Sequence, residues 1–96
     1  MYVLVTYDVA SGSPAGSRRL RRVAKVCIQY GQRVQYSVFE CMVDPGQFEK
    51  MKHELEKIID PNVDSLRFYN LGSHWHSRVE HIGAKQSYDP EGLLLI

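Results

Sequence analysis

Asp8 is the first residue of the chain whose type and position suit metal chemistry. It stands near the carboxyl end of an apolar run at residues 2–9 and borders a loop rich in Ser, Gly and Pro. Mg²⁺ takes oxygen ligands and often only one or two carboxylates, with waters and phosphate oxygens completing its shell. One carboxylate is a poor site, so a metal at Asp8 requires a second copy of the chain across a twofold axis. The alternative is an aspartate that caps the turn at residues 10–16.

Basic side chains form the second chemical feature. Residues 17–33 hold six Lys and Arg and no Asp or Glu, whereas residues 40–64 hold seven acidic and three basic residues. Four arginines fall within five positions, with no acidic residue three or four positions away to offset their repulsion. The run is either a solvated helix face or a contact surface for a polyanion, whose phosphates the helix arginines would meet.

Polar residues interrupt a second apolar run, at residues 34–43. Gln35 and Ser37 mark either a sheet edge in contact with water or a polar groove beside Asp8. In such a groove Arg33 would pair with phosphate, which suits its fork of donors, and Ser37 would supply a hydroxyl. Four aromatic residues are candidates for base stacking, although such side chains more often belong to the core. They are Tyr7, Tyr30, Tyr36 and Phe39.

The composition favours a single domain that spans residues 1–96. Hydrophobic residues make up 44% of the chain, Lys plus Arg number 12, and Asp plus Glu number 11. This near balance excludes a uniformly basic nucleic-acid protein and a disordered acidic tail. No apolar run is long enough to span a membrane. The two cysteines lack CxxC spacing, which argues against a disulfide scaffold or a cysteine zinc site, so a cytoplasmic protein is expected.

The first half of the chain predicts a strand followed by a helix. Residues 2–9 are rich in Val, Leu, Thr and Tyr, and both faces of this strand are largely apolar. After the loop at residues 10–16, Ser17 is expected to cap an amphipathic helix. Gly31 is expected to end that helix in a left-handed conformation. The apolar stripe of the helix consists of Leu20, Val23, Ala24, Cys27 and Ile28.

The middle of the chain predicts a second β region and a second helix. Residues 34–43 form either one long strand or two short strands with a kink near Tyr36 and Ser37. Asp44, followed by Pro and then Gln three positions on, has the pattern of a capped helix start. The apolar stripe of this helix continues until Pro61, which is expected to stop it.

The last third predicts a strand at residues 65–71, a short strand at residues 79–84 and an apolar tail at residues 93–96. The order β-α-β(β)-α-β predicts an α+β, ferredoxin-like βαββαβ fold with both helices on one face of the sheet. The other face is expected to meet a second copy of the chain. Ferredoxin-like dimers also serve as small-molecule regulatory domains, but the basic segment and the lack of a Gly-rich ligand loop disfavour that function.

Three segments resemble a known family. VLVTYDV at residues 3–9 resembles the opening strand of the small CRISPR-associated protein that accompanies the spacer-acquisition integrase, the second core protein of that system. QRVQYSVFEC at residues 32–41 is similar to the second-strand motif of the family, in which Q-x-S-V-F recurs. VEHIGAK at residues 79–85 is similar to the tail of the type I-C branch. The order of elements agrees from end to end.

The resemblance implies a ferredoxin-like homodimer in which two strand-end aspartates face each other around a divalent cation. Asp8 takes that position, so Mg²⁺ or Mn²⁺ would be shared between two copies of Asp8. The family also implies partners, namely the integrase subunit and duplex DNA or RNA. A strand-forming tail at about residues 79–96 would make contacts within the dimer or with the partner.

The resemblance further implies a function in CRISPR adaptation, that is, in antiviral defence and spacer acquisition. Members of the family act as metal-dependent endonucleases on duplex DNA or single-stranded RNA, which implies phosphodiester hydrolysis here. The alternative is a non-catalytic dimeric scaffold that holds DNA by its backbone and bridges integrase subunits. The residues implied in catalysis are Asp8, Tyr7 and Ser37. Those implied in nucleic-acid binding are Arg18, Arg19, Arg22, Arg33 and Phe39.

Overall fold

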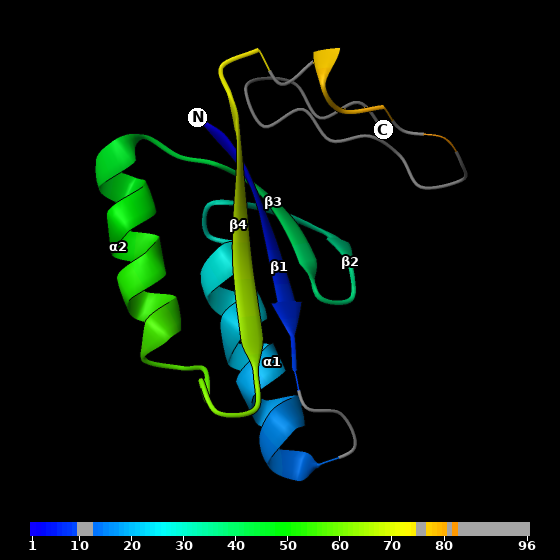
Figure 1. Cartoon of the computed structure of the whole chain (residues 1–96), viewed down its shortest axis with the longest axis vertical. Coiled ribbons are helices and arrows are strands. Elements are labelled where there is room, and N and C mark those ends of the chain that lie inside the picture. Colours follow the sequence, from blue (N-terminus) through cyan, green and yellow to red (C-terminus); the bar gives the residue numbers. More distant parts are fainter. Residues whose placement is uncertain (10–12, 75–76, 81, 83–96) are drawn as a thin grey trace.

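The computed structural model describes residues 1–9, 13–74, 77–80 and 82. These form β1 (Tyr2–Asp8), α1 (Pro14–Cys27), β2 (Gly31–Gln35), β3 (Val38–Met42), α2 (Pro45–Glu56) and β4 (Ser65–Gly72). The strands make one antiparallel sheet in the order β2-β3-β1-β4 (Figure 1). This arrangement confirms the predicted α+β, ferredoxin-like βαββαβ fold.

The alternation of side chains along β1 gives the sheet two different faces. Val3, Val5 and Tyr7 are buried among apolar side chains from both helices, and we call this side the covered face. Thr6 and Asp8 point the other way, to the side that we call the open face. In Figure 1 α1 and α2 lie on one side of the sheet, as the sequence predicts.

The helix α1 begins earlier than predicted. Ser13 is its N-cap, because the Oγ atom of Ser13 accepts a hydrogen bond from the backbone N–H of Gly16 at 2.9 Å. The prediction of a cap at Ser17 is wrong because Pro14 extends the helix backward. Proline has a backbone angle suited to the first helical position and no N–H to leave unpaired. The N–H of Ser17 instead bonds to the Ser13 carbonyl at 3.1 Å.

Gly31 begins a strand instead of ending a helix, which corrects a second prediction. The helix α1 ends at Cys27, and among the described glycines only Gly72 has a positive φ angle. A Cβ atom on Gly31 would lie 1.9 Å from the backbone oxygen of Glu40 on β3. Glycine is therefore needed at this position because two backbones approach each other closely, and not because of a left-handed cap.

The apolar run at residues 34–43 is divided between β2 and β3 by a turn at Tyr36 and Ser37, which is the second of the two predicted alternatives. The pairing of β2 with β3 shifts register between Arg33 and Gln35. Such a shift marks a β-bulge, which bends a strand and increases its twist. The turn therefore lies beside the end of β1, where the backbone N–H of Tyr7 bonds to the Ser37 carbonyl at 2.9 Å.

The start of α2 confirms the predicted capping box. The N–H of Gln47 donates to the Asp44 carboxylate at 2.7 Å, and the N–H of Asp44 donates to the Gln47 side chain at 2.9 Å. The helix ends at Glu56, before Pro61, so proline does not itself terminate it. Turns follow it until β4 begins at Ser65.

The C-terminal segment is described only in part. Val79, Glu80 and Ile82 belong to no strand, and the rest of the strand predicted at residues 79–84 lies outside the described residues. The apolar tail at residues 93–96 also lies outside them. No helix within the described ranges is long and apolar enough to cross a membrane.

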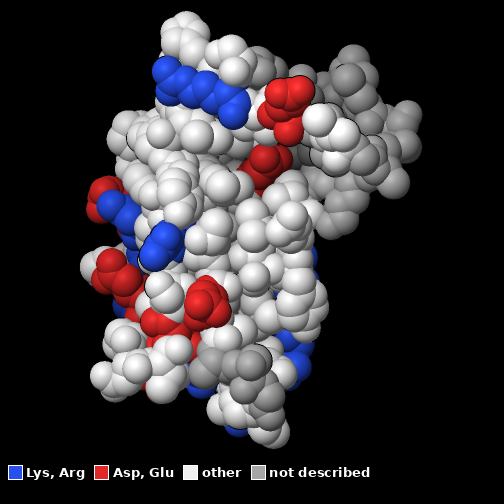
Figure 2. Space-filling view, turned by 45° about the vertical axis from the view of Figure 1, so that its right-hand side comes forward, with Lys and Arg blue, Asp and Glu red and all other residues white. Residues whose placement is uncertain are grey.

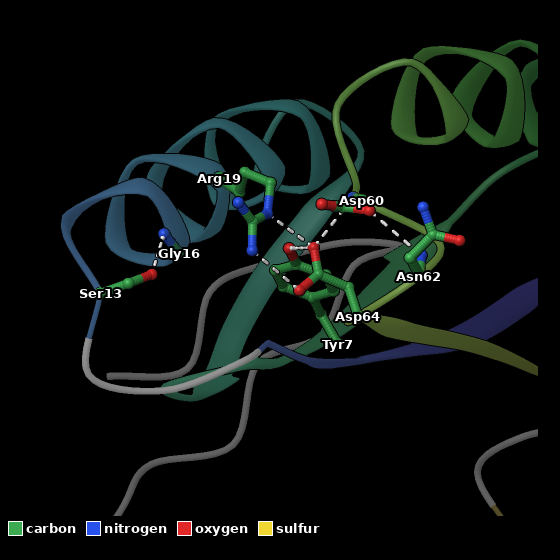
Figure 3. A network of polar contacts seen from close by, with 7 residues as sticks. All are labelled: Tyr7, Ser13, Gly16, Arg19, Asp60, Asn62 and Asp64. Atoms are coloured by element: carbon green, nitrogen blue, oxygen red, sulfur yellow. Dashed lines mark hydrogen bonds and ion pairs between the residues drawn. The ribbon is translucent and has the colours of Figure 1, made fainter.

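A buried ionic cluster joins β1, α1 and the connection between α2 and β4 (Figure 3). The side chain of Asp64 has no exposed surface, and its carboxylate accepts hydrogen bonds from Tyr7 Oη at 2.5 Å and from Arg19 Nε at 2.7 Å. Arg19 Nη2 donates a third bond at 3.1 Å, and the backbone N–H of Asp60 donates a fourth at 3.0 Å. We call Tyr7, Arg19, Asp60 and Asp64 the Asp64 cluster.

The Asp64 cluster keeps its two side-chain donors, Tyr7 and Arg19, in their protonated forms. Burial raises the pKa of Tyr7 to about 12, and the hydrogen bond to Asp64 acts in the same direction. The hydrogen bond to Asp64 also raises the pKa of Arg19. Tyr7 is therefore a neutral donor at physiological pH, and it is bound to the Asp64 carboxylate 57 positions later in the chain.

The substitution Gly31→Ala should lower the free energy of unfolding by about 1–3 kcal/mol, because the added methyl group overlaps the backbone of β3. Gly46→Ala is the matched control, since the nearest atom to a Cβ there is Asp44 Oδ1 at 3.4 Å. Alanine within a helix should leave stability unchanged or raise it. Urea unfolding of both variants measures the difference, and equal stability of the two would contradict the close approach at Gly31.

Tyr7 should make the stability of the protein fall at high pH. The pKa of tyrosine is ordinarily 10.0 and that of folded Tyr7 is about 12, so the unfolded chain releases its proton first. Protonated Tyr7 therefore makes its full contribution to the free energy of unfolding below pH 10. This contribution, about 3 kcal/mol at most, is lost as the pH rises through 12. Urea unfolding of wild type and Tyr7→Phe across this range isolates it, and identical losses in the two proteins would disprove it.

Candidate functional site

Asp8 ends β1 on the open face, at the margin of a polar hollow of about 330 Å³. The hollow is lined by polar side chains of β1 and β4, and antiparallel pairing of these strands places Asp8 opposite Ser65. Asp8 is exposed, and its carboxylate makes no hydrogen bond or ion pair with any described residue. The turn at residues 10–16 that Asp8 would alternatively cap lies partly outside the described residues. The lining residues are Thr6, Asp8, Ser65, Arg67 and Tyr69.

Arg67 and Tyr69 extend from β4 into the same hollow. Arg67 pairs with Thr6 and Tyr69 with Leu4 across the β1–β4 ladder, so both side chains lie on the open face. Arg67 Nη1 donates a long hydrogen bond of 3.4 Å to Tyr69 Oη. This bond is the main cause of a raised pKa of Arg67, and the nearby negative charge of Asp8 contributes less. The hollow thus holds a carboxylate and a guanidinium that form no direct ion pair.

The residues present suit a divalent cation only if two chains contribute. Across the described residues, no group of three or more His, Cys, Asp and Glu side chains could hold a metal ion. Asp8 alone supplies one carboxylate, exposed on the open face beside polar side chains. Mg²⁺ is commonly bound by one or two carboxylates together with waters and phosphate oxygens. The donor set therefore fits a weak site that a second Asp8 would complete.

Two residues expected to act with Asp8 lie on the covered face instead. Tyr7 precedes Asp8 in the same strand, so its side chain points to the opposite side, where its hydroxyl donates a hydrogen bond to the Asp64 carboxylate. Phe39 pairs with Val5 and is 0% exposed in the core. A base cannot stack on a side chain with no exposed surface. The structure therefore gives Tyr7 and Phe39 packing partners in place of a substrate.

Arg33 and Ser37 lie near the turn between β2 and β3. Ser37 is half-buried, and its carbonyl contacts the Tyr7 backbone directly beside the end of β1. Arg33 is exposed and pairs with Phe39, which puts its side chain on the covered side of the sheet. Its guanidinium lies 4.9 Å from the Tyr36 ring centroid and donates to the Tyr36 carbonyl at 2.8 Å. Arg33 therefore does not share the hollow with Asp8.

The basic residues of α1 fall into two groups. Arg18 and Arg22 are exposed, whereas the Arg19 side chain is only 17% exposed and is held by Asp64. The helix α1 that carries these arginines packs on the covered face, whereas the Asp8 side chain points to the open face. On the side of the molecule shown in Figure 2, basic side chains lie interspersed with acidic ones and do not merge into one basic area.

Sequence patterns identify Asp8 but overlook the rest of its hollow. In β4, polar Ser65, Arg67 and Tyr69 alternate with apolar Leu66 and Phe68. That period of two is the available signal, because it places the polar set on one face of a half-buried strand. The partnership of Arg19 with Asp64 has no comparable local signal, since the two residues are 45 positions apart.

Comparison with known proteins places the chain in a family. The model of the family described as CRISPR associated protein Cas2 matches residues 1–79. The CRISPR-associated endoribonuclease Cas2 of Chlorobaculum tepidum is 62% identical over 96 residues, which is 100% of both chains. The CRISPR-associated endonuclease Cas2 of Halalkalibacterium halodurans is 56% identical over 95 residues, or 99% of each chain.

A solved structure agrees with these sequence matches. The crystal structure of Streptococcus pyogenes Cas2 at pH 6.5 superposes with a TM-score of 0.80 at 60% sequence identity. The match covers 86% of this chain and 100% of the streptococcal chain. Because the family model spans most of the sequence and the relatives match nearly end to end, the protein belongs to the CRISPR-associated Cas2 family.

Proposed function

We propose that two copies of this chain form a metal-dependent endonuclease of CRISPR adaptation, in the type I-C branch, that hydrolyses phosphodiester bonds. The observation that carries the proposal is the exposed Asp8 carboxylate, free of described partners in a polar hollow on the open face. Relatives named endoribonuclease and endonuclease support the reaction class. Because these names differ, single-stranded RNA and duplex DNA are both candidate substrates.

The chain's own residues prepare the site around Asp8. The Asp8 carboxylates of the two copies would hold Mg²⁺ or Mn²⁺, and the bound ion would supply an activated water molecule and positive charge to offset the charge that develops on the phosphate. Tyr7 is a positioning residue. Its hydrogen bond to Asp64 fixes the side-chain alternation at the end of β1 and so directs Asp8 to the open face. Ser37 lies beside this strand end and supplies a hydroxyl, and Phe39 supports the turn from within the core.

The dimer that this site requires fits the open face of the sheet. Half-buried Leu4, Val38 and Met42 and the 43% exposed Tyr69 lie on that face together with Asp8. Apolar side chains left without a covering helix favour association with another surface. A twofold axis would bring the same residues of both copies together, including the two carboxylates.

The remaining partners of the proposed assembly are the integrase subunit and a nucleic acid in the cytoplasm. We assign residues 79–96 as the segment that adds strand contacts within the dimer or to the integrase, since its last four residues are all apolar. Residues 1–78 then form the ferredoxin-like body, and the tail belongs to the same domain. No membrane contact is part of this proposal.

A second function, a scaffold that holds duplex DNA, is supported by the exposed cations of α1. Arg18, Arg21, Arg22 and Lys25 are exposed and form no ion pair with another described residue. Such side chains bind a phosphate backbone without reading its sequence. They lie away from the Asp8 hollow, so this function does not require cleavage. Arg33 adds an exposed cation at the hairpin turn.

Asp8→Asn should reduce metal-dependent cleavage by about 100-fold or more, because it removes the charged metal ligand. Asp8 is exposed, and its carboxylate has no hydrogen-bond or ion-pair partner among the described residues, so circular dichroism and urea unfolding should match wild type. The measurement is cleavage of single-stranded RNA and of duplex DNA with Mg²⁺ or Mn²⁺, alongside EDTA controls. Glu56→Gln, an exposed carboxylate on α2, is the matched control and should cleave at the wild-type rate.

Cleavage by Asp8→Asn at the full rate would remove the catalytic proposal. Loss of cleavage in Glu56→Gln as well would also count against it, because a general change in charge would then explain the result. Absence of cleavage by wild type on both substrates would leave the scaffold as the function. The substrate that wild type cuts, and Asp8→Asn does not, identifies the nucleic acid on which the site acts.

The double variant Arg18→Gln/Arg22→Gln should weaken duplex DNA binding and flatten its salt dependence. Each phosphate contact that is lost should reduce the slope of log K against log salt concentration by about 0.9. Fluorescence anisotropy with a labelled duplex in EDTA measures the slope without cleavage. A matched double variant, Lys50→Gln on α2 with Lys57→Gln at its C-cap, removes the same charge from exposed positions outside α1. Equal slopes in both double variants would exclude a specific role of α1.

A further inference from the structure

Arg67 is a cation on the open face for which neither the sequence motifs nor the family resemblance provides a role. It is exposed, and it has no ion-pair partner among the described residues. Its single described hydrogen bond is the long contact of 3.4 Å to Tyr69 Oη. A guanidinium offers five N–H donors in a planar fork. Most of these donors are therefore left to face the hollow or the solvent.

The position of Arg67 relative to Asp8 is fixed by the β1–β4 ladder. Arg67 pairs with Thr6, and two positions along the same face Asp8 pairs with Ser65. The two charged groups thus line one hollow of about 330 Å³, and the negative charge of Asp8 is near enough to influence Arg67. They do not neutralise each other in a direct ion pair. One wall of the hollow suits a cation, and the other suits an anion.

We propose that Arg67 binds a backbone phosphate of the nucleic-acid strand that lies against Asp8, which makes the hollow a phosphate subsite. The fork of a guanidinium matches two non-bridging phosphate oxygens, which accept its hydrogen bonds in parallel. This inference deepens the proposed function, on which it rests for the choice of a nucleic acid as ligand. It concerns binding, however, and it holds whether or not the bound strand is cut.

Arg67 differs in this respect from the arginines that the sequence singles out. Arg19 is committed to Asp64, and Arg33 lies on the covered side of the sheet. The exposed arginines of α1 belong to a helix on the covered face, whereas Asp8 points to the open face. Of the arginines within the described ranges, Arg67 is the one that lines the hollow with Asp8. A phosphate held beside the Asp8 of one chain therefore meets the guanidinium from β4 of the same chain.

Tyr69 has the contacts of a residue that positions this guanidinium. Its ring is 43% exposed on the open face, and its hydroxyl accepts a hydrogen bond from Arg67 Nη1. The bond restrains one corner of the fork and leaves the opposite edge, with Nε and Nη2, for a ligand. Tyr69→Phe should therefore weaken phosphate binding by less than the loss of Arg67 itself, without changing the charge of the site.

The test is the binding of labelled single-stranded RNA and labelled duplex DNA in EDTA, by fluorescence anisotropy, between about 50 and 200 mM KCl. Arg67→Gln should bind its nucleic acid about tenfold more weakly at low salt. For each phosphate contact removed, the slope of log K against log salt concentration should fall by about 0.7 for RNA or 0.9 for duplex DNA. Arg67→Lys keeps the charge and should retain most of the slope while losing part of the affinity. Lys50→Gln, an exposed cation on α2, should resemble wild type.

Three results would overturn the assignment. The first is an Arg67→Gln salt slope equal to that of wild type on both nucleic acids, and the second is no binding of either nucleic acid by wild type. The third is dissociation of the dimer by Arg67→Gln in sedimentation velocity runs on the same samples, because Arg67 would then serve the subunit interface. Absence of cleavage by wild type would defeat the nuclease proposal alone, since the binding assay contains no metal.

Discussion

The orientation of Asp8 depends on the residue before it. Adjacent residues of a strand point to opposite faces, so the chain cannot place both Tyr7 and Asp8 on the same side of the sheet. The Asp64 carboxylate holds the Tyr7 hydroxyl on the covered face at 2.5 Å. Asp8 is consequently turned to the open face, beside β4. A slip of one residue in β1 would bury the carboxylate against the helices and expose the phenol.

This arrangement requires a buried charge, and the fold supplies the partners that make one tolerable. The Asp64 side chain is 0% exposed, and a carboxylate without partners there would be strongly disfavoured. It receives two bonds from Arg19, one from Tyr7 and one from the backbone of Asp60. Ionic groups buried in this way often add little net stability, but they penalise any packing that leaves them unpaired. The Asp64 cluster therefore favours one position of β1 relative to α1 and to the α2–β4 connection.

The sequence patterns predict the element order, the α2 cap and the place of Asp8 at the end of the first strand, because each depends on residues close together in the chain. They misplace the start of α1 because Ser13 and Ser17 are both good caps, and only the position of Pro14 distinguishes them. The role of Gly31 depends on the backbone of β3, which arrives nine residues later. Arg19 is indistinguishable from Arg18 in composition and neighbours. Neighbouring residues of a helix point about 100° apart, and this difference alone places Arg19 in a buried ion pair and leaves Arg18 an exposed cation.

The separation of charges across the sheet also relates the two proposed functions to each other. In a dimer joined through the open faces, Asp8 and Arg67 of both copies lie at the junction, whereas Arg18 and Arg22 lie on the outer helices. A duplex that follows the outer helices touches their cations without reaching the carboxylates. A strand that is cut must instead enter the junction. Duplex binding by the α1 cations and cleavage at Asp8 would therefore use different surfaces, and losing one set of side chains need not remove the function of the other.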